Sequence, residues 1–201
     1  MPTDSTTIRN VARKPGERRL QILQTLAAML EHPKGERITT ALLARRLDVS
    51  EAALYRHFAS KAQMYEGLIE FIEQTVFGLV NQICASEENG LAQLRRMLLM
   101  LLQFPETNRG MTRVLVGDAL VIEDDRLQER MNQFMDRVEA SLRQSLKVAA
   151  AQGAAVAEAE IPARANLLLA WVAGRWLQFA KSGFRKKPSE HAELQIRLLV
   201  G

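Results

Sequence analysis

The sequence lacks the features that disulfide-bonded and membrane-spanning proteins need. Cys84 is the only cysteine among 201 residues, which excludes an internal disulfide and suits a reducing cytoplasm. We interpret Cys84 as a small core residue. The longest apolar stretches, around 97–102 and 167–174, are too short to cross a bilayer, and residues 1–16 are too polar and basic for a signal peptide. We therefore expect a cytoplasmic protein with no membrane partner.

Recognisable catalytic motifs are also missing. The three histidines, His32, His57 and His191, are far apart and none has the HExxH spacing of a zinc site. The chain has no GxSxG motif, no P-loop and no paired cysteines. The acidic run 123–125 is typical of a helix start, where carboxylates complement the helix dipole. We expect no catalytic residue, no cofactor and no metal.

Positive charge is concentrated at one end of the chain. The net charge is +4, but residues 1–61 hold 11 Lys and Arg against 6 Asp and Glu, whereas the remainder holds 16 against 17. A basic excess confined to one segment indicates a polyanionic partner bound there.

The hydrophobic pattern is helical almost throughout, and no stretch alternates as a strand would. We predict an all-α protein of about nine helices. Residues 1–14 are expected to form a flexible basic arm, 15–61 a helix-turn-helix domain, and 62–201 a larger helical domain for regulation and dimerisation.

Breakers and composition divide the larger domain. Pro105 is expected to end an amphipathic helix, because proline cannot continue one. A long polar helix should follow over about 124–151. The Ala/Gly-rich stretch 149–159 is the best candidate for a mobile loop, and two helices, about 162–181 and 189–199, complete the chain.

The stretch "VSEAALYRHFASK", residues 49–61, places polar chemistry on one side of a short helix. Thr39 or Thr40 caps a helix that runs to Leu47, and after a two-residue link Ser50 caps a second helix, with Glu51 in its first turn. This spacing predicts a helix-turn-helix, whose second helix enters the major groove of DNA.

The second helix, expected over 50–58, has a packing face and a reading face. The packing face carries Val49, Leu54 and Phe58. On the other side, small residues allow close approach to base edges, and side chains with hydroxyl, guanidinium or imidazole groups can bind phosphate. Lys61 adds charge at the start of the next helix. The expected DNA-binding residues are Thr39, Thr40, Ser50, Glu51, Ala52, Ala53, Tyr55, Arg56, His57 and Lys61. The partner would be double-stranded DNA.

The segment "ITTALLARRLDVSEAALYRHFASKAQMYEGLIEFIE" resembles the DNA-binding region of TetR-family regulators. It matches the family pattern of Ser, Leu-Tyr-x-His-Phe and a following Lys. The family usually has proline after the Phe, where this chain has Ala59, so we expect a slightly less rigid turn there. The resemblance implies a TetR-like fold and a homodimer.

Within that family, "RITT", "VSEAALYRHF", "LIEFIE" and "MTRVL" are similar to the branch that acts in nucleoid occlusion. That similarity is dense over 18–145 and thin afterwards. It implies a nucleoid-associated protein that binds chromosomal palindromes, with more than one dimer at a site as a possibility. While bound, it would inhibit the tubulin-like division protein FtsZ and prevent septum formation over the nucleoid.

The same resemblance places an FtsZ groove between a helix expected from Ser60 to about Ala85 and the amphipathic helix before Pro105. Its residues would be Phe71, Met100, Gln103, Asn108 and Arg109. The alternative for Phe71 and Met100 is that they are core residues, as aromatic and Met side chains at helical spacing usually are.

The stretch "NLLLAWVAGRWLQFA" is the expected dimerisation helix. Leu168, Trp171 and Arg175 lie on adjoining faces, and small residues between them allow a second helix to approach. The alternative is that this helix only fills the core of its own subunit.

A second function remains open, that of a TetR-like repressor released from DNA by a small ligand in the C-terminal domain. Such a switch needs a cavity with different affinity for the two states. The C-terminal core is aliphatic and shows no obvious polar cluster for recognising a ligand, which favours nucleoid occlusion.

Overall fold

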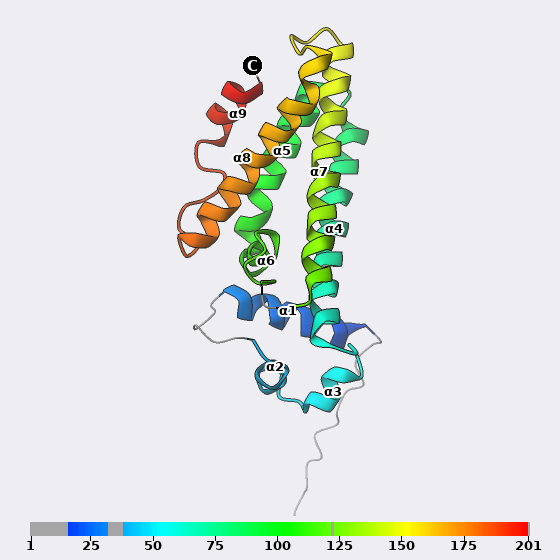
Figure 1. Ribbon diagram of the computed structural model, residues 1–201, viewed down its shortest axis with the longest axis vertical. Helices are drawn as coiled ribbons and strands as arrows, with labels where there is room; N and C mark the ends of the chain where they lie inside the picture. The colour runs from blue at the N-terminus through cyan, green and yellow to red at the C-terminus, as the bar shows by residue number, and fades with distance from the viewer. Residues whose placement is uncertain (1–15, 32–37, 122, 201) are drawn as a thin grey trace, which may run out of the picture.

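In the computed structural model, the described residues are 16–31, 38–121 and 123–200 (Figure 1). Over these residues the chain forms nine α-helices and no strand, which confirms the all-α prediction. The expected arm, 1–14, lies outside the described residues. The helices are α1 (Glu17–Glu31), α2 (Thr40–Arg46), α3 (Glu51–Tyr55), α4 (Lys61–Ser86), α5 (Gly90–Thr107), α6 (Arg109–Leu115), α7 (Asp125–Ala151), α8 (Ile161–Lys181) and α9 (Ala192–Val200).

The molecule is elongated, with the three N-terminal helices grouped at one end (Figure 1). α4 starts among them at Lys61 and runs up into a bundle with α5, α7 and α8. The domain boundary expected between residues 61 and 62 therefore falls inside the first turn of α4. One continuous helix links the two ends.

The bundle core follows from the amphipathic spacing of α7. Its buried residues recur every three or four positions, which places them on one face of the helix. That face packs against α5 and α8, while charged residues cover the outer side. The buried residues include Leu127, Met131, Phe134, Val138 and Leu142.

Pro105 does not end α5, contrary to the prediction. The helix continues to Thr107 with Pro105 inside it. Proline has no N–H to donate to the carbonyl four residues earlier, that of Leu101. The indole Nε1–H of buried Trp176 donates to that carbonyl instead, at 2.7 Å. A tertiary hydrogen bond therefore replaces the lost helical one.

Cys84 is exposed, so its interpretation as a core residue is wrong. Val80 and Ile83 take the buried positions in this last part of α4. The next residue is turned about 100° around the helix and faces outward.

The N-terminal helices join the bundle mainly where α1 packs on α6. The two backbones approach so closely at Gly110 that a Cβ there would lie 1.8 Å from the carbonyl oxygen of Ala27. Only glycine fits this crossing.

Candidate nucleic-acid interface

The turn between α2 and α3 is held by hydrogen bonds of both the backbone and the side chains. Asp48 adopts a left-handed conformation with φ 53°, which a short acidic residue tolerates. The Val49 N–H donates to the Ala44 carbonyl at 3.0 Å, and the Thr40 hydroxyl donates to Glu51 Oε2 at 2.6 Å. The two helices are thereby fixed relative to each other.

Side-chain caps define where the interface helices begin. The Thr39 hydroxyl accepts from the Leu42 N–H at 3.1 Å, and the Ser50 hydroxyl accepts from the Ala53 N–H at 3.2 Å. The structure thus decides between Thr39 and Thr40 as the cap of α2. α3 is shorter than expected, because regular helix ends at Tyr55 and a turn carries the chain to Phe58.

The second helix presents the two faces that the sequence predicts. Leu54 and Phe58 are buried and Val49 is half-buried. The opposite face is open to solvent, apart from a half-buried Ala53. Its exposed residues are Ser50, Glu51, Ala52, Tyr55, Arg56 and His57.

α1 supports this face from behind. The Arg19 guanidinium lies 4.2 Å from the centroid of the Phe58 ring and donates to the His57 carbonyl at 3.3 Å. The turn at Ala59 is also held, since its N–H donates to Gln63 Oε1 at 2.8 Å. A proline at this position would have no N–H for that bond.

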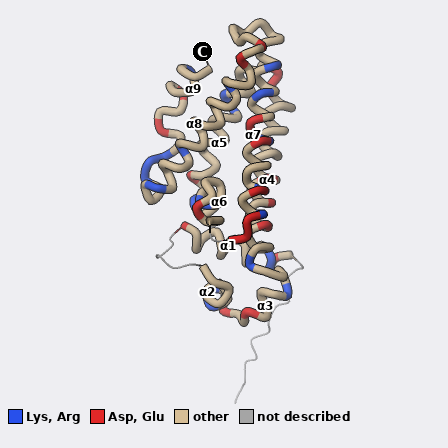
Figure 2. The backbone as a smooth tube through the Cα atoms, viewed as in Figure 1, with Lys and Arg blue, Asp and Glu red and all other residues tan. Residues whose placement is uncertain are grey.

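Two exposed cations near the interface are not among the DNA-binding residues expected from the sequence. Arg45 and Arg46 end α2 beside the reading helix, and both face solvent. Figure 2 shows basic residues on α2 and near α3, at the end of the molecule farthest from the bundle. Arg45 and Arg46 could have been found from the sequence, because they are basic residues in the last turn of the first helix of the motif.

Lys61, which the sequence predicts to bind phosphate, has a partner within the protein. Its ammonium group forms an ion pair with Glu123, from the segment between α6 and α7. The Lys61 side chain is 18% exposed and that of Glu123 is 7% exposed. The ammonium therefore faces the protein interior.

Glu123–Asp125 behave as a helix start. Asp124 caps α7 and accepts from the Arg126 N–H at 3.1 Å. The side-chain and backbone hydrogen bonds from Arg126 lower the pKa of Asp124 to about 2. Within 16–31, 38–121 and 123–200, no group of three or more His, Cys, Asp or Glu is placed to hold a metal ion.

A groove of about 600 Å³ runs between α4 and α5. Met100, Gln103 and Asn108, all expected there, line it. Phe71 and Arg109 are exposed but lie outside its lining. Phe71 precedes the lining residue Thr75 by one helical turn, so it extends the same stripe toward the N-terminal helices.

The lining of this groove is mostly apolar. Leu79, Ile83, Leu99 and Phe104 contribute to it, and Arg96 is its charged residue. Phe71 is 38% exposed, so the alternative that it is a core residue fails. Met100 is half-buried at the groove wall.

The predicted dimerisation residues do not form an outward face. Leu168 is 2% exposed and packs in its own core. Arg175 donates to the carbonyls of Lys187, Pro188 and Glu190 and so holds the loop before α9. Trp171 is half-buried. In the single chain Leu168 and Arg175 thus contact residues of their own subunit, and their part in dimerisation stays a prediction.

The outward faces of α8 and α9 carry four exposed leucines instead. Leu167 and Leu177 lie on α8, and Leu194 and Leu198 on α9. On α8 the half-buried Trp171 and Gly174 fall between them at helical spacing. A shift of one residue from Leu168 to Leu167 turns the side chain about 100°.

None of the helices in the described part of the chain is long and apolar enough to span a membrane.

A helix-turn-helix on a helical bundle with this order of elements defines the TetR class of DNA-binding proteins. Residues 27–68 match the family described as bacterial regulatory proteins, tetR family, and residues 88–201 match the tetracyclin repressor-like C-terminal domain of the SlmA-like type. The fold is shared with the fatty acid degradation regulator FadR of Bacillus halodurans, at 14% identity and a TM-score of 0.77 over 94% of this chain and 97% of that one. PfmR of Thermus thermophilus gives 21% identity and a TM-score of 0.74 over 90% and 97%.

Closer relatives narrow the class. The nucleoid occlusion factor SlmA of Idiomarina loihiensis is 47% identical over 94% of this chain and 96% of its own length. The factor of the same name from Alteromonas mediterranea is 47% identical over 88% and 91%. The chain belongs to the SlmA branch of the TetR family.

Proposed function

We propose that this protein binds chromosomal palindromes as a homodimer and, while bound, inhibits FtsZ assembly, so that no septum forms over the nucleoid. The proposal rests on one observation above the others. Relatives whose name is nucleoid occlusion factor match nearly the full length of the chain, including both the helix-turn-helix and the helices that form the α4–α5 groove.

In DNA recognition, one set of residues would read base edges and another would bind phosphate and so position the protein on the duplex. Ala52 and Ala53 are small enough for base edges to come close, and their methyl groups can contact thymine methyls. Tyr55, Arg56 and His57 lie at the flank of the same helix, where they would contact phosphate. Arg45 and Arg46 would add phosphate contacts from α2.

Dimerisation would place two recognition helices on successive major grooves, about 34 Å apart. The exposed leucines of α8 and α9 supply an apolar surface for a second copy. A Cβ at Gly174 would meet no atom within 4 Å, so space remains for a helix to approach there.

The α4–α5 groove would hold an extended segment of FtsZ. Its apolar lining suits aliphatic side chains, and Arg96 suits a carboxylate at one end. Phe71 and Arg109 would contact the segment beyond the groove itself, while Gln103 and Asn108 offer hydrogen bonds at the rim.

Sedimentation of FtsZ polymers, with and without operator DNA, tests this function. The unmodified protein should reduce the pellet when DNA is present. Leu79→Asp should abolish that inhibition and leave operator affinity within about threefold, a change under 1 kcal/mol. Val121→Asp, at an exposed loop position, is the matched control and should keep both activities.

Two outcomes would contradict this proposal. If a folded Leu79→Asp protein still blocks assembly, the groove is not the FtsZ site. If the unmodified protein neither shifts palindromic DNA in a gel nor changes the pellet, the proposed function is wrong.

One observation keeps the ligand-released repressor as a second candidate. A cleft of about 330 Å³ lies between α6, α7 and α8, with Met131, Met135 and Trp176 among apolar residues and the amides of Gln128 and Asn132 in its lining. A metabolite that raises the melting temperature and releases DNA would support this candidate.

A further inference from the structure

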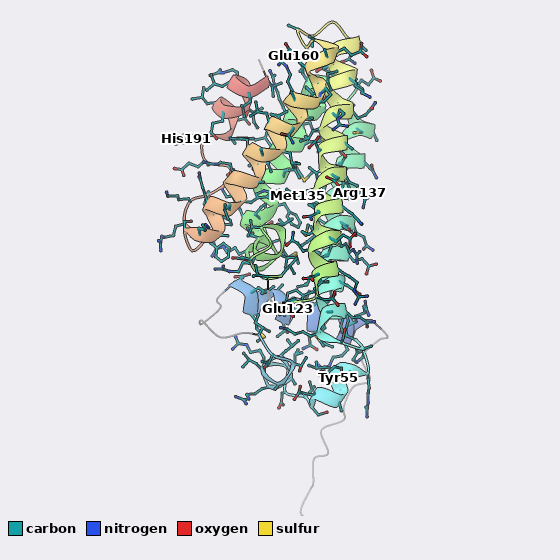
Figure 3. All side chains as sticks on the ribbon, in the orientation of Figure 1. Tyr55, Glu123, Met135, Arg137, Glu160 and His191 are labelled. Carbon is teal, nitrogen blue, oxygen red and sulfur yellow. The ribbon has the colours of Figure 1, made fainter. Side chains whose placement is uncertain are left out.

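The junction between the helix-turn-helix and the bundle contains one ion pair that DNA binding has not explained. Lys61 is the first residue of α4, directly after the Ser60 cap, and Glu123 directly precedes the Asp124 cap of α7. The pair therefore joins the starts of two long helices. Figure 3 shows Glu123 at the level of α1, between the bundle and the end that carries Tyr55.

The surroundings hold the Lys61 ammonium in place. It lies 5.5 Å from the centroid of the Tyr65 ring, and Tyr65 is itself buried. Glu123 is more deeply buried than its partner. Moving Lys61 to a phosphate would leave a buried carboxylate without this cation, which is costly in a region of low dielectric.

The pair also adds a contact at the junction of the helix-turn-helix with the bundle. α1 packs on α6 at the Gly110 crossing and also on α4, which itself runs from the helix-turn-helix into the bundle. Lys61 and Glu123 add an ion pair where α3 leads into α4. Because it ties the start of α4 to the residue before the α7 cap, it limits how far the helix-turn-helix can tilt against the bundle.

We propose that the Lys61–Glu123 pair positions the helix-turn-helix against the bundle and thereby sets the separation of the two recognition helices in the dimer. Lys61 is then a positioning residue, and phosphate contacts come from the exposed arginines. The inference rests on the proposed DNA binding and reassigns one residue within it.

Salt dependence separates positioning from phosphate binding. Operator affinity of the full-length protein is measured across a range of salt for Lys61→Met, Glu123→Gln and the double variant. Positioning predicts that each single change weakens binding by about tenfold or more, that the double variant is no weaker than either, and that the salt slope is unchanged. A phosphate ligand at Lys61 predicts a slope smaller by about 0.9 and no loss for Glu123→Gln.

A charge exchange gives a second, independent readout. Lys61→Glu combined with Glu123→Lys should recover most of the affinity lost by Lys61→Glu alone, and Lys61→Arg should bind nearly as well as the unmodified protein. If Lys61 binds phosphate, the exchanged protein stays weak, because a carboxylate then faces the DNA. That outcome, or a slope change for Lys61→Met, overturns the inference.

Distances provide the check on mechanism. Spin labels at Arg45→Cys in a Cys84→Ser background should give a broader distribution between protomers in Lys61→Met than in the parent, at a temperature where both are folded. An unchanged distribution contradicts positioning. Failure of the unmodified protein to bind any palindrome would instead count against the proposed function.

Discussion

The exposed leucines of α8 and α9 allow the effect of a substitution on dimerisation to be estimated in numbers. Leu198 is 75% exposed in the single chain, although it is a leucine on an ordered helix. Complete burial of a leucine side chain contributes about 1.5–3 kcal/mol, so covering the exposed part would contribute about 1–2 kcal/mol. A two-fold interface contains the residue twice, which raises the effect to about 2–4 kcal/mol.

Leu198→Glu removes this contribution and places a charge where it must lose water. The dimer dissociation constant should therefore rise by about 30-fold to 1,000-fold, at 1.4 kcal/mol per factor of ten. Sedimentation velocity over a concentration series measures it, and DNA binding to a palindrome should weaken in parallel. Val121→Glu, at a loop residue of similar exposure, is the matched control and should leave the dimer intact.

A Leu198→Glu protein that sediments as the same dimer at the same concentrations would refute this assignment. A folded Leu168→Glu protein that is monomeric, while the Leu198→Glu protein stays dimeric, would also refute it, because Leu168 is at a core position. In either case the interface would use a different face of α8 and α9.

Three further predictions concern stability. Trp176→Phe leaves the Leu101 carbonyl, which Pro105 cannot bond, without a donor. It should lower the free energy of unfolding by about 1–3 kcal/mol, measured in urea. Gly110→Ala should destabilise by at least about 1–3 kcal/mol because α1 must move, whereas Gly78→Ala, with open space at its Cβ, should stabilise by about 0.5–1 kcal/mol. Because the pKa of Asp124 in the folded protein is lowered to about 2 from 3.8, its contribution to stability is present above about pH 4 and lost as pH falls toward 2. The stability difference between the parent and Asp124→Ala, in denaturant titrations, should shrink over that range.

The sequence predicted most of the local structure of the helix-turn-helix because its signals are local. Caps, turn length and the spacing of Leu54 and Phe58 act within a few residues, and each is found in the structure. The exception is Lys61, whose partner lies 62 residues away in sequence. No local pattern indicates a contact of that range.

The errors in the larger domain arise because a helical pattern does not show which residues tertiary packing will bury or which groups tertiary hydrogen bonds will satisfy. Helical periodicity identifies an apolar stripe but tells poorly which of two neighbouring residues faces inward when both are apolar. "NLLLAW" offers three leucines in a row, and the structure buries Leu168 while exposing Leu167. Pro105 shows the same limit, since the donor that permits it comes from another helix.

The length of α4 sets how far the α4–α5 groove lies from the helix-turn-helix. From Lys61 to Thr75 the helix rises roughly 21 Å, so the groove begins about that far along α4 from the helix-turn-helix. Two-fold symmetry would then hold two grooves at a constant separation, set by the same contacts that space the recognition helices. If the groove binds an extended segment of FtsZ, as proposed, a single subunit with one such segment would occupy only one groove. A filament would present many copies of the segment, and after the first copy binds, the second would be at high effective concentration if the spacings match. The rigid rise of one helix would thus make the complex respond to polymerised FtsZ more strongly than to free subunits.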